Sequence, residues 1–250
     1  MTVETNSRPA GRARADELTS SSGFDCNSDN YVSEVESAIR FAGTGLDHYT
    51  REKARLLWSL IDGRLVTATT RALSILDVGC GIGLIHPMMI SGRSSLFGVD
   101  VAEQPLHKAS AAHPAARYVK YDGSVLPFHD ATFDVTYTIC VLHHVPMGRW
   151  AEFMQEMYRV TRPGGLVCVI EHNPLNPLTR LVVNRCEFDR DAVLLWPWKL
   201  KSIFAEIGLR HASISHFLFF PSDAPWFRSI ANRLTWLPLG AQYCVSALRS

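Results

Sequence analysis

The stretch LDVGCGIGL, residues 76–84, decides the fold that this sequence predicts. It places Gly79, Gly81 and Gly83 at alternate positions directly after an apolar run. Glycine lacks a Cβ atom, so this spacing allows both a tight turn and a close approach of a ligand to the backbone. We expect a buried strand, then a glycine loop, then a helix whose first N–H groups are free. A tight strand–helix turn without a ligand would also fit this stretch alone.

The spacing of the glycines separates the nucleotide-binding alternatives. A nicotinamide dinucleotide fingerprint reads G-x-G-x-x-G or A, whereas this chain reads G-x-G-x-G. A P-loop is excluded, because no G-K-[ST] follows the glycines. A nicotinamide-dependent oxidoreductase therefore stays open only as the weaker alternative.

Aspartates stand at the ends of three successive predicted strands. Asp77 comes two residues before the first glycine, Asp100 ends "LFGVD", and Asp122 ends "KYD". The carboxyl ends of parallel strands meet at one edge of a sheet, where ligands bind. A carboxylate at that edge can accept both hydroxyls of a ribose. One such aspartate is typical of a helix cap, but three in succession indicate a site for a nucleoside.

Short apolar runs alternate with helical segments from residue 73 onward, which favours βαβ units and a parallel sheet. We predict an α/β, Rossmann-like fold with seven mostly parallel strands, helices on both faces, an antiparallel C-terminal edge strand and an N-terminal helical lid. The "RPGG" at 162–165 is expected to stop a helix before the fifth strand. The predicted strands are 73–78, 95–100, 116–121, 133–139, 165–171, 210–219 and 241–248. The predicted helices are 31–41, 46–61, 84–91, 103–112, 148–161 and 198–207.

The composition of the chain is that of an ordinary globular protein. Its 250 residues include 25 basic and 24 acidic side chains, a net charge of +1, and no basic stripe, so no nucleic-acid partner is expected. The six cysteines are scattered without a C-x-x-C pair, which indicates a reduced, cytoplasmic protein. The sequence shows no signal peptide and no apolar run long enough to span a membrane.

The domain organisation follows from the same patterns. Residues 1–22 lack periodicity and are expected to be a disordered tail. We expect a single domain over 23–250, divided into an N-terminal helical cap at 23–65, a cofactor-binding core at 72–172, and substrate-side and C-terminal strands at 173–250.

Four longer stretches extend the glycine motif: "ILDVGCGIG" (75–83), "LFGVDVAE" (96–103), "YDGSVLPFHDATFDVTYTICVLHHV" (121–145) and "EMYRVTRPGGLVCVIEH" (156–172). In this order they resemble the motifs of class I S-adenosylmethionine-dependent methyltransferases. The small-molecule enzymes similar to ubiquinone and menaquinone methyltransferases resemble the chain most. The resemblance covers roughly residues 24–172, beginning with "FDCNSDNY" (24–31), where Asn27 and Ser28 depart from the pattern of that subgroup.

The resemblance implies S-adenosyl-L-methionine as cofactor and gives each matching position a role. The glycines, with Cys80 between them, make room for the methionine part, and Asp77 orients its ammonium group. Asp100 holds the ribose diol and Val101 flanks the adenine. Asp122 faces the adenine amine, and the backbone of Gly123 passes close to the ring. Cys140, with Val141 after it, lines the sulfonium region. The resemblance leaves a catalytically silent cofactor-binding module as an alternative, although the glycines and the ribose aspartate are all present.

Methyl transfer from a sulfonium is an in-line displacement with a neutral leaving group, so positioning supplies most of the catalysis. A general base is needed only where the acceptor loses a proton. Among His143, His144, Glu171 and His172, which follow the fourth strand or end the fifth, we predict His144, His172 and Glu171 as catalytic. We predict no metal, because adjacent histidines on a loop rarely both ligate and no structural-zinc spacing is present.

The C-terminal part of the chain raises the question of the acceptor. Residues 188–250 contain 11 of the 25 aromatic side chains. Strand packing explains most of them. The rest predict an apolar pocket, or a peripheral membrane or lipid contact, for a small acceptor that is aromatic or lipid-like.

Overall fold

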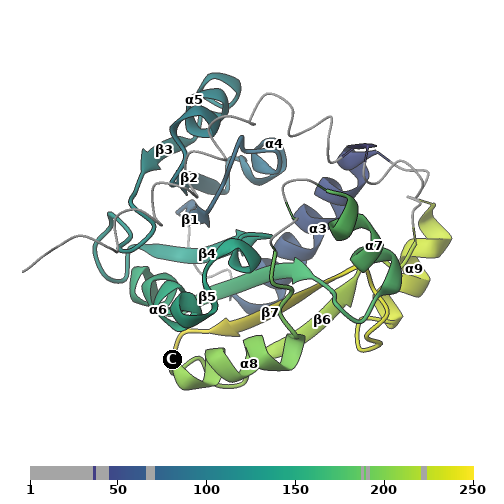
Figure 1. Cartoon of the computed structure of the whole chain (residues 1–250). Helices are drawn as coiled ribbons and strands as arrows, with labels where there is room; N and C mark the ends of the chain where they lie inside the picture. Colours follow the sequence, from purple (N-terminus) through teal and green to yellow (C-terminus); the bar gives the residue numbers. More distant parts are fainter. Residues whose placement is uncertain (1–35, 38–44, 66–70, 187–188, 190–191, 221–223) are drawn as a thin grey trace, which may run out of the picture.

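The computed structural model describes residues 36–37, 45–65, 71–186, 189, 192–220 and 224–250. In this part of the chain a seven-stranded sheet has the order β3-β2-β1-β4-β5-β7-β6 (Figure 1). Strands β1 to β5 run parallel, and β7 is antiparallel to both of its neighbours. The predicted fold class is confirmed, with the antiparallel strand one position in from the edge that β6 forms. The strands are β1 (Leu73–Val78), β2 (Ser94–Asp100), β3 (Arg117–Lys120), β4 (Phe133–Ile139), β5 (Thr161–His172), β6 (Ser213–Phe217) and β7 (Gln242–Leu248).

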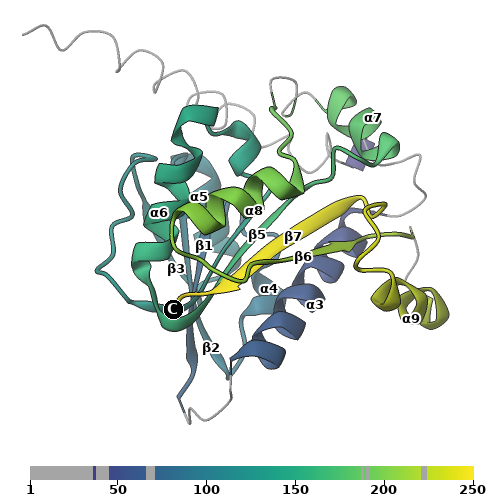
Figure 2. The same cartoon turned by 90° about the horizontal axis from the view of Figure 1, so that it is seen from below.

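Helices cover both faces of the sheet (Figure 2). Buried side chains of α3 and α4 pack on one face, and those of α6 and α8 pack on the other. The helices are α3 (Leu46–Arg64), α4 (His86–Met89), α5 (Glu103–Ala112), η2 (Leu142–His144), η3 (Met147–Arg149), α6 (Trp150–Val160), α7 (Pro177–Arg185), α8 (Pro197–Glu206) and α9 (Pro225–Arg233).

Helix α6 shows why these segments fold as helices on the sheet. Its buried residues recur at three- and four-residue spacing, which puts them on one side of the helix. They are Trp150, Phe153, Met154, Met157 and Val160. Each large apolar side chain buried in this way contributes about 1.5–3 kcal/mol, so the stripe fixes α6 against β4 and β5.

The N-terminal helix α3 belongs to the core of the protein. Leu57 and Ile61 are fully buried against the sheet, and the Trp58 indole donates a hydrogen bond to the Met88 carbonyl at 2.9 Å. Most of the expected helix at 31–41, and the expected tail at 1–22, lie outside the described residues. Among the described residues, no helix combines the length and apolar character needed to cross a bilayer.

Three local features differ from the sequence-based expectation. Helix α4 has only four residues, because the backbone is already extended at Ile90. Helix α6 ends at Val160, and the "RPGG" residues lie inside β5, at a register shift opposite the start of β4. Helices α7 and α9 were not predicted; each begins with a proline, whose missing N–H costs little in the first turn.

Candidate active site

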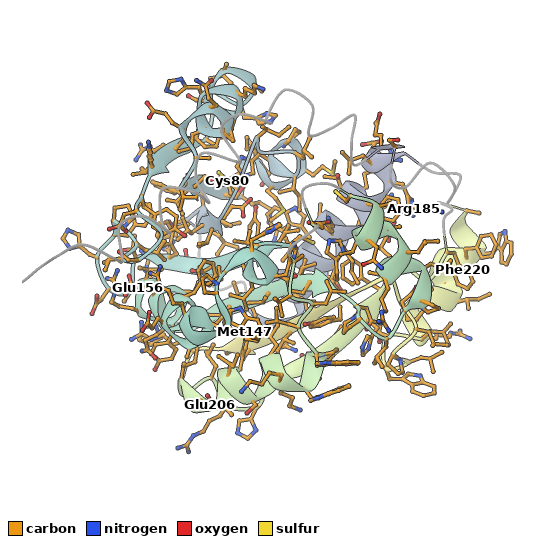
Figure 3. The ribbon with its side chains drawn as sticks, viewed as in Figure 1. Cys80, Met147, Glu156, Arg185, Glu206 and Phe220 are labelled. Carbon is orange, nitrogen blue, oxygen red and sulfur yellow. The ribbon has the colours of Figure 1, made fainter. Side chains whose placement is uncertain are left out.

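The glycine loop joins β1 to α4 at the carboxyl end of the parallel strands, and Cys80 on this loop is labelled in Figure 3. The backbone N–H groups of Gly79 and Cys80 donate to the Val99 carbonyl of β2 at 2.8 and 3.0 Å. All three glycines have positive φ angles of +75°, +53° and +72° in chain order. Glycine adopts this conformation without the cost that other residues incur.

The three glycines differ in their surroundings. A Cβ atom at Gly79 would lie 2.5 Å from Val141 Cγ2, and one at Gly83 would lie 2.7 Å from His86 Nδ1. A Cβ atom at Gly81 would meet no heavy atom within 4 Å. Packing inside the protein therefore requires glycine at the first and third positions. The middle glycine faces the open side of the loop, where a ligand can reach the backbone.

Asp100 links the end of β2 to this loop. Its Oδ2 accepts the N–H of Gly81 at 2.8 Å, and its Oδ1 accepts the N–H of Ala102 at 2.9 Å. Burial raises the pKa of the Asp100 carboxyl, and the two backbone hydrogen bonds oppose this shift. Each carboxylate oxygen has a second lone pair. The carboxylate can therefore accept two ligand hydroxyls while it stays bonded to the loop.

Asp77 is buried and takes part in a network that the sequence pattern does not reveal. Its Oδ2 lies 3.0 Å from Nε2 of the fully buried His86, and His86 Nδ1 lies 2.6 Å from the Tyr118 hydroxyl. Asp77 Oδ1 is also buried and makes no hydrogen bond of regular geometry within the described part of the chain, although the hydroxyl of the fully buried Tyr137 interacts with the Asp77 side chain. An orphaned buried carboxylate oxygen at a ligand site fits the ammonium group of a ligand or a bridging water.

Asp122 folds back on the turn that follows β3. Its Oδ1 accepts hydrogen bonds from the backbone N–H and the hydroxyl of Ser124 at 2.9 and 2.6 Å. The bonds to Ser124 lower the pKa of the exposed Asp122 carboxyl. Gly123 follows with a φ of +80°, and a Cβ atom there would lie 3.3 Å from Val101 Cγ1. The turn thus puts the Gly123 backbone directly beside Val101.

Cys140 directly follows β4 and has a left-handed backbone conformation, with a φ of +55°. Such strain in a residue other than glycine is typical of functional sites. The Cys140 N–H donates to the Ile170 carbonyl at 2.8 Å, and Gln242 Nε2 lies 3.2 Å from its Sγ. Burial raises the pKa of the thiol to about 11. Cys140 is therefore a neutral thiol at physiological pH.

Glu171, near the end of β5, is fully buried and holds the turn that follows β4. Its Oε1 accepts the N–H of Leu142 at 2.8 Å, and its Oε2 lies 2.6 Å from His143 Nδ1. A carboxylate only accepts hydrogen bonds, so Nδ1 carries the hydrogen in this pair. Glu171 therefore fixes the orientation of the His143 ring and leaves Nε2 on the opposite side.

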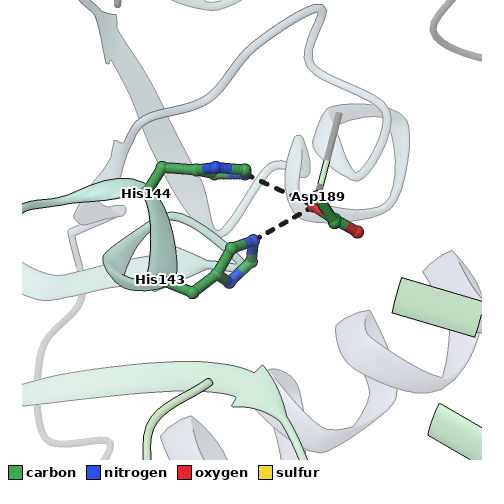
Figure 4. A group of neighbouring side chains, drawn as sticks. All are labelled: His143, His144 and Asp189. Carbon is green, nitrogen blue, oxygen red and sulfur yellow. Dashed lines mark hydrogen bonds and ion pairs between the residues drawn. The ribbon is translucent and has the colours of Figure 1, made fainter. Parts of the chain in front are cut away.

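Asp189 gathers three imidazoles, and we call His143, His144, His172 and Asp189 the histidine cluster. Asp189 Oδ1 lies 3.3 Å from His143 Nε2 and 3.5 Å from His144 Nε2 (Figure 4). Asp189 Oδ2 lies 3.9 Å from His172 Nε2. The sequence did not identify Asp189, because "CEFDRDAV" matches no motif and only the fold brings it to the ends of β4 and β5.

Electrostatics set the protonation of the cluster. Burial lowers the pKa of His143, but Glu171 and Asp189 outweigh this effect and hold the pKa well above its usual value. Burial, followed by repulsion from His143, lowers the pKa of His144 and of His172 to about 4. Burial raises the pKa of Asp189, yet the histidines bring it down to about 2. At neutral pH the cluster therefore contains one imidazolium, two neutral imidazoles and a carboxylate.

The glycine loop with its neighbouring aspartates and the histidine cluster thus lie at the same edge of the sheet. Val141, two residues before His143, packs on Gly79 and joins the two groups. Residues 76–169 match the family profile described as "Methyltransferase domain". This stretch is therefore similar to a methyltransferase domain. The resemblance stated from the sequence motifs is confirmed, and the nicotinamide alternative finds no support.

Curated methyltransferases are similar in sequence to part of this chain. An uncharacterised methyltransferase of Mycobacterium sp. (strain JLS) is 39% identical over 93 residues, which are 37% of this chain and 36% of the relative. The 2-methyl-6-phytyl-1,4-hydroquinone methyltransferase of Synechocystis sp. is 31% identical over 104 residues, 40% of this chain and 32% of the relative. The chain thus spans about a third of the length of these two curated relatives.

The fold has solved counterparts. The crystal structure of a SAM dependent methyltransferase from Archaeoglobus fulgidus superimposes with a TM-score of 0.62 at 18% identity. The superposition covers 82% of this chain and 95% of that chain. The methyltransferase fold therefore extends beyond the stretch that the family profile matches.

Proposed function

We propose that this protein transfers a methyl group from S-adenosylmethionine to a small organic acceptor that is aromatic or lipid-like. One observation carries the proposal: the Asp100 carboxylate is hydrogen-bonded to Gly81, the glycine that faces open space. A diol-binding carboxylate beside an accessible loop backbone suits a nucleoside with an attached amino-acid chain. The methyltransferase domain at 76–169 supports the reaction class.

The cofactor-binding residues are assigned from their surroundings together with the motif resemblance. Asp77 Oδ1 is the orphaned acceptor for the ammonium group, and Asp100 is the acceptor for the ribose hydroxyls. Val101 and Gly123 flank the adenine, and Asp122 accepts from its amine. The proposed set is Asp77, Gly79, Cys80, Gly81, Gly83, Asp100, Val101, Asp122, Gly123 and Cys140.

The histidine cluster is assigned to the acceptor side. The bound sulfonium supplies the methyl group to an in-line displacement, and the chain's own residues orient the acceptor. We assign His172 and His144 as catalytic residues that contact the acceptor, with His172 taking a proton where the acceptor loses one. Asp189 then stabilises the imidazolium. Glu171, predicted as catalytic, is assigned as a positioning residue because it reaches the site only through His143 and the backbone.

The relative from Synechocystis supports the acceptor class, since it is named for a hydroquinone that carries a phytyl chain. A screen of phenols, quinols and lipids, read out as S-adenosylhomocysteine release, tests this assignment. Turnover with an aromatic or lipid-like acceptor is expected. A complete lack of turnover in a protein that binds the cofactor would favour the silent binding module.

Cofactor binding is tested by calorimetry with S-adenosylmethionine, S-adenosylhomocysteine and NAD. We expect binding of both adenosyl compounds and none of NAD. Asp100→Ala should weaken binding at least about tenfold, because a charge-assisted contact is worth about 1.5–3 kcal/mol. Asp62→Ala is the matched control, since Asp62 forms an exposed ion pair with Arg93. Unchanged affinity in Asp100→Ala would remove the ribose assignment.

We also propose a peripheral contact with lipid. Four tryptophans of the C-terminal part are exposed: Trp196 (42%), Trp198 (56%), Trp226 (60%) and Trp236 (72%). The exposed Lys199 and Lys201 lie beside Trp198 in the chain. Exposed indoles near lysines suit a membrane surface with anionic lipids. No nucleic-acid partner is proposed.

Vesicle co-sedimentation tests this contact. The protein should bind vesicles of phosphatidylcholine with phosphatidylserine, and the double variant Trp196→Ala, Trp198→Ala should bind less, because these stacked indoles lie beside the two lysines. Val125→Ala removes an equally exposed apolar side chain elsewhere and should change nothing. Equal sedimentation with and without vesicles would reject the contact.

A cytoplasmic location is proposed from the cysteines. All five described cysteines are free, and three of them are buried. Free thiols are typical of a reducing compartment. Cell fractionation with an antibody to the protein should recover it with cytoplasmic markers, and recovery in the secreted fraction would refute the proposal.

A further inference from the structure

We propose that His143, His144 and Asp189 form a binding site for a divalent transition-metal ion on the acceptor side of the methyltransferase domain. The inference goes beyond methyl transfer, because it assigns a second ligand to residues outside the proposed cofactor-binding set. Figure 4 shows the two imidazoles approaching the same carboxylate.

The spacing of the three groups suits a metal. Their ligand atoms all lie within 4.8 Å of one another, and the two imidazole–carboxylate distances are 3.3 and 3.5 Å. Ligands about 2.0–2.2 Å from a tetrahedral ion are about 3.4 Å apart. Direct charge-assisted hydrogen bonds are shorter, at about 2.7–2.9 Å. Two of the three distances between the ligand atoms therefore already match the spacing of ligands around a tetrahedral ion.

A fixed outer partner strengthens the assignment. Glu171 holds His143 Nδ1 at 2.6 Å, and both side chains are only 1% exposed. A carboxylate that accepts from one ring nitrogen and aims the other at the ion is the usual support of a metal-binding histidine. On binding, the ion would displace any proton on His143 Nε2 into solvent, so one coordinate bond replaces one N–H bond.

The turn after β4 lets two histidines that are adjacent in the chain face the same point. His143 and His144 lie in the 3-10 helix η2, with ring centroids 4.1 Å apart. The prediction of no metal rested on the observation that adjacent histidines on a loop rarely both ligate, and on the missing spacing of a structural zinc site. In η2 both Nε2 atoms instead reach Asp189 Oδ1.

The ligand types indicate which ion the site would take. Two imidazoles and one carboxylate suit Zn²⁺ or Co²⁺ better than Mg²⁺ or Ca²⁺, which prefer oxygen ligands. Three protein ligands leave a coordination position for water or an acceptor oxygen. The side chains of His144 and Asp189 are 23% and 14% exposed, so an ion can enter. That an acceptor oxygen occupies the open position rests on the proposed function. With the ion bound, His144 would act on the acceptor through the ion, and His172 would contact the acceptor directly.

Cobalt binding tests the site in the full chain, produced without a histidine tag and stripped of metal. Titration with Co²⁺ should give visible d–d absorption with one ion per chain, and Zn²⁺ should displace it. His144→Ala and Asp189→Asn should abolish this signal, and Glu171→Gln should weaken binding about 10- to 100-fold. His129→Ala removes an exposed histidine elsewhere and should bind Co²⁺ like the wild type.

Calorimetry with S-adenosylhomocysteine on the same samples separates loss of the metal site from misfolding. Variants that lose Co²⁺ but keep normal cofactor affinity support the site. Where His144→Ala or Asp189→Asn has lost both Co²⁺ binding and cofactor binding, the Glu171→Gln variant decides. Co²⁺ binding about 10- to 100-fold weaker than in the wild type, with normal cofactor affinity, supports the site, and Co²⁺ binding as tight as in the wild type refutes it. The site is refuted if wild-type protein gives no d–d absorption, or if folded His144→Ala and Asp189→Asn bind Co²⁺ as tightly as wild type. Failure of cofactor binding in the wild type would refute the proposed function and leave the metal result intact.

Discussion

Gly79 and Gly81 have similar positive φ angles but face opposite kinds of surroundings. A left-handed conformation costs a residue with a Cβ atom about 1–2 kcal/mol. At Gly79 the new methyl group would also meet Val141 at 2.5 Å, and overpacking adds about 1–3 kcal/mol. Gly79→Ala should therefore lower the free energy of unfolding by about 2–5 kcal/mol, and Gly81→Ala by about 1–2 kcal/mol. Urea denaturation followed by circular dichroism measures both.

Comparing Gly79→Ala with Gly81→Ala separates an effect on stability from an effect on cofactor binding. The methyl group of Gly81→Ala would stand on the open side of the loop, where the cofactor is proposed to lie. This variant should stay folded at 25 °C and bind S-adenosylhomocysteine at least about tenfold more weakly, a loss of about 1.4 kcal/mol. If Gly81→Ala binds like the wild type, the ligand does not approach this face of the loop.

Single residues differ in how far the sequence reveals them. The glycines and the strand-end aspartates stand out because their local pattern follows directly from a strand–loop–helix unit. His86 and Asp189 gave no such signal, since their partners Asp77 and His143 meet them only after the chain has folded. Asp189 lies beyond the end of β5, on a segment whose sequence indicates no element. Long-range polar pairs of this kind require the structure.

At the scale of elements, Asp134 ties the start of β4 to two other segments. Its carboxylate accepts from the Arg71 side chain and the Ser74 N–H at 2.7 Å each, and from Arg162 at 2.8 Å. Burial raises the pKa of Asp134, but these bonds outweigh it and hold the pKa below its usual value. A lowered pKa in the folded state stabilises the protein above the unfolded pKa, about 3.9. That contribution is lost as the pH falls through the folded pKa.

Asp134→Asn should therefore lower the free energy of unfolding at pH 7 by about 1.5–3 kcal/mol. The difference from wild type should shrink as the pH drops below about 4. Thermal melts across this range measure it. Asp62→Asn is the control, because its exposed pair with Arg93 contributes only about 0–1 kcal/mol. A constant difference between Asp134→Asn and wild type down to pH 2.5, about a unit and a half below the unfolded pKa, would contradict the assignment.

Buried helices and strands are easier to predict from the sequence than exposed ones. Strands β1, β4 and β7 are almost completely buried, so they read as short apolar runs with sharp ends, and their bounds match within one residue. Helices α7 and α9 expose most of those side chains that the structure describes in them, and proline at their start resembles a loop signal. The order of β7 and β6 depends on packing between distant segments, which local periodicity does not encode.

At the scale of the whole molecule, the proposed site draws on two regions of the chain. The matched segment at 76–169 contains the proposed cofactor-binding residues together with His143 and His144, while His172, Asp189 and the exposed tryptophans lie after it. The family profile matches only this segment, whereas the superposition with the Archaeoglobus fulgidus structure covers 82% of the chain and shows the fold alone. We therefore expect further acceptor-binding residues in the C-terminal part, where the sequence contains the fewest recognisable motifs.

Binding of the cofactor product should stabilise the whole fold. A ligand present at 100 times its dissociation constant adds about 2.7 kcal/mol to the free energy of unfolding. In a protein of this size each kcal/mol raises Tm by about 2–4 °C. S-adenosylhomocysteine should therefore raise the melting temperature by about 5–10 °C in differential scanning fluorimetry. NAD should leave it unchanged. With Asp100→Ala, S-adenosylhomocysteine at the same concentration should raise it by at most about 3–6 °C, because tenfold weaker binding leaves about 1.4 kcal/mol of stabilisation. An equal rise with NAD would mean that the glycine loop accepts any adenine nucleotide, and the methyl-transfer proposal would lose its support in the geometry of the site.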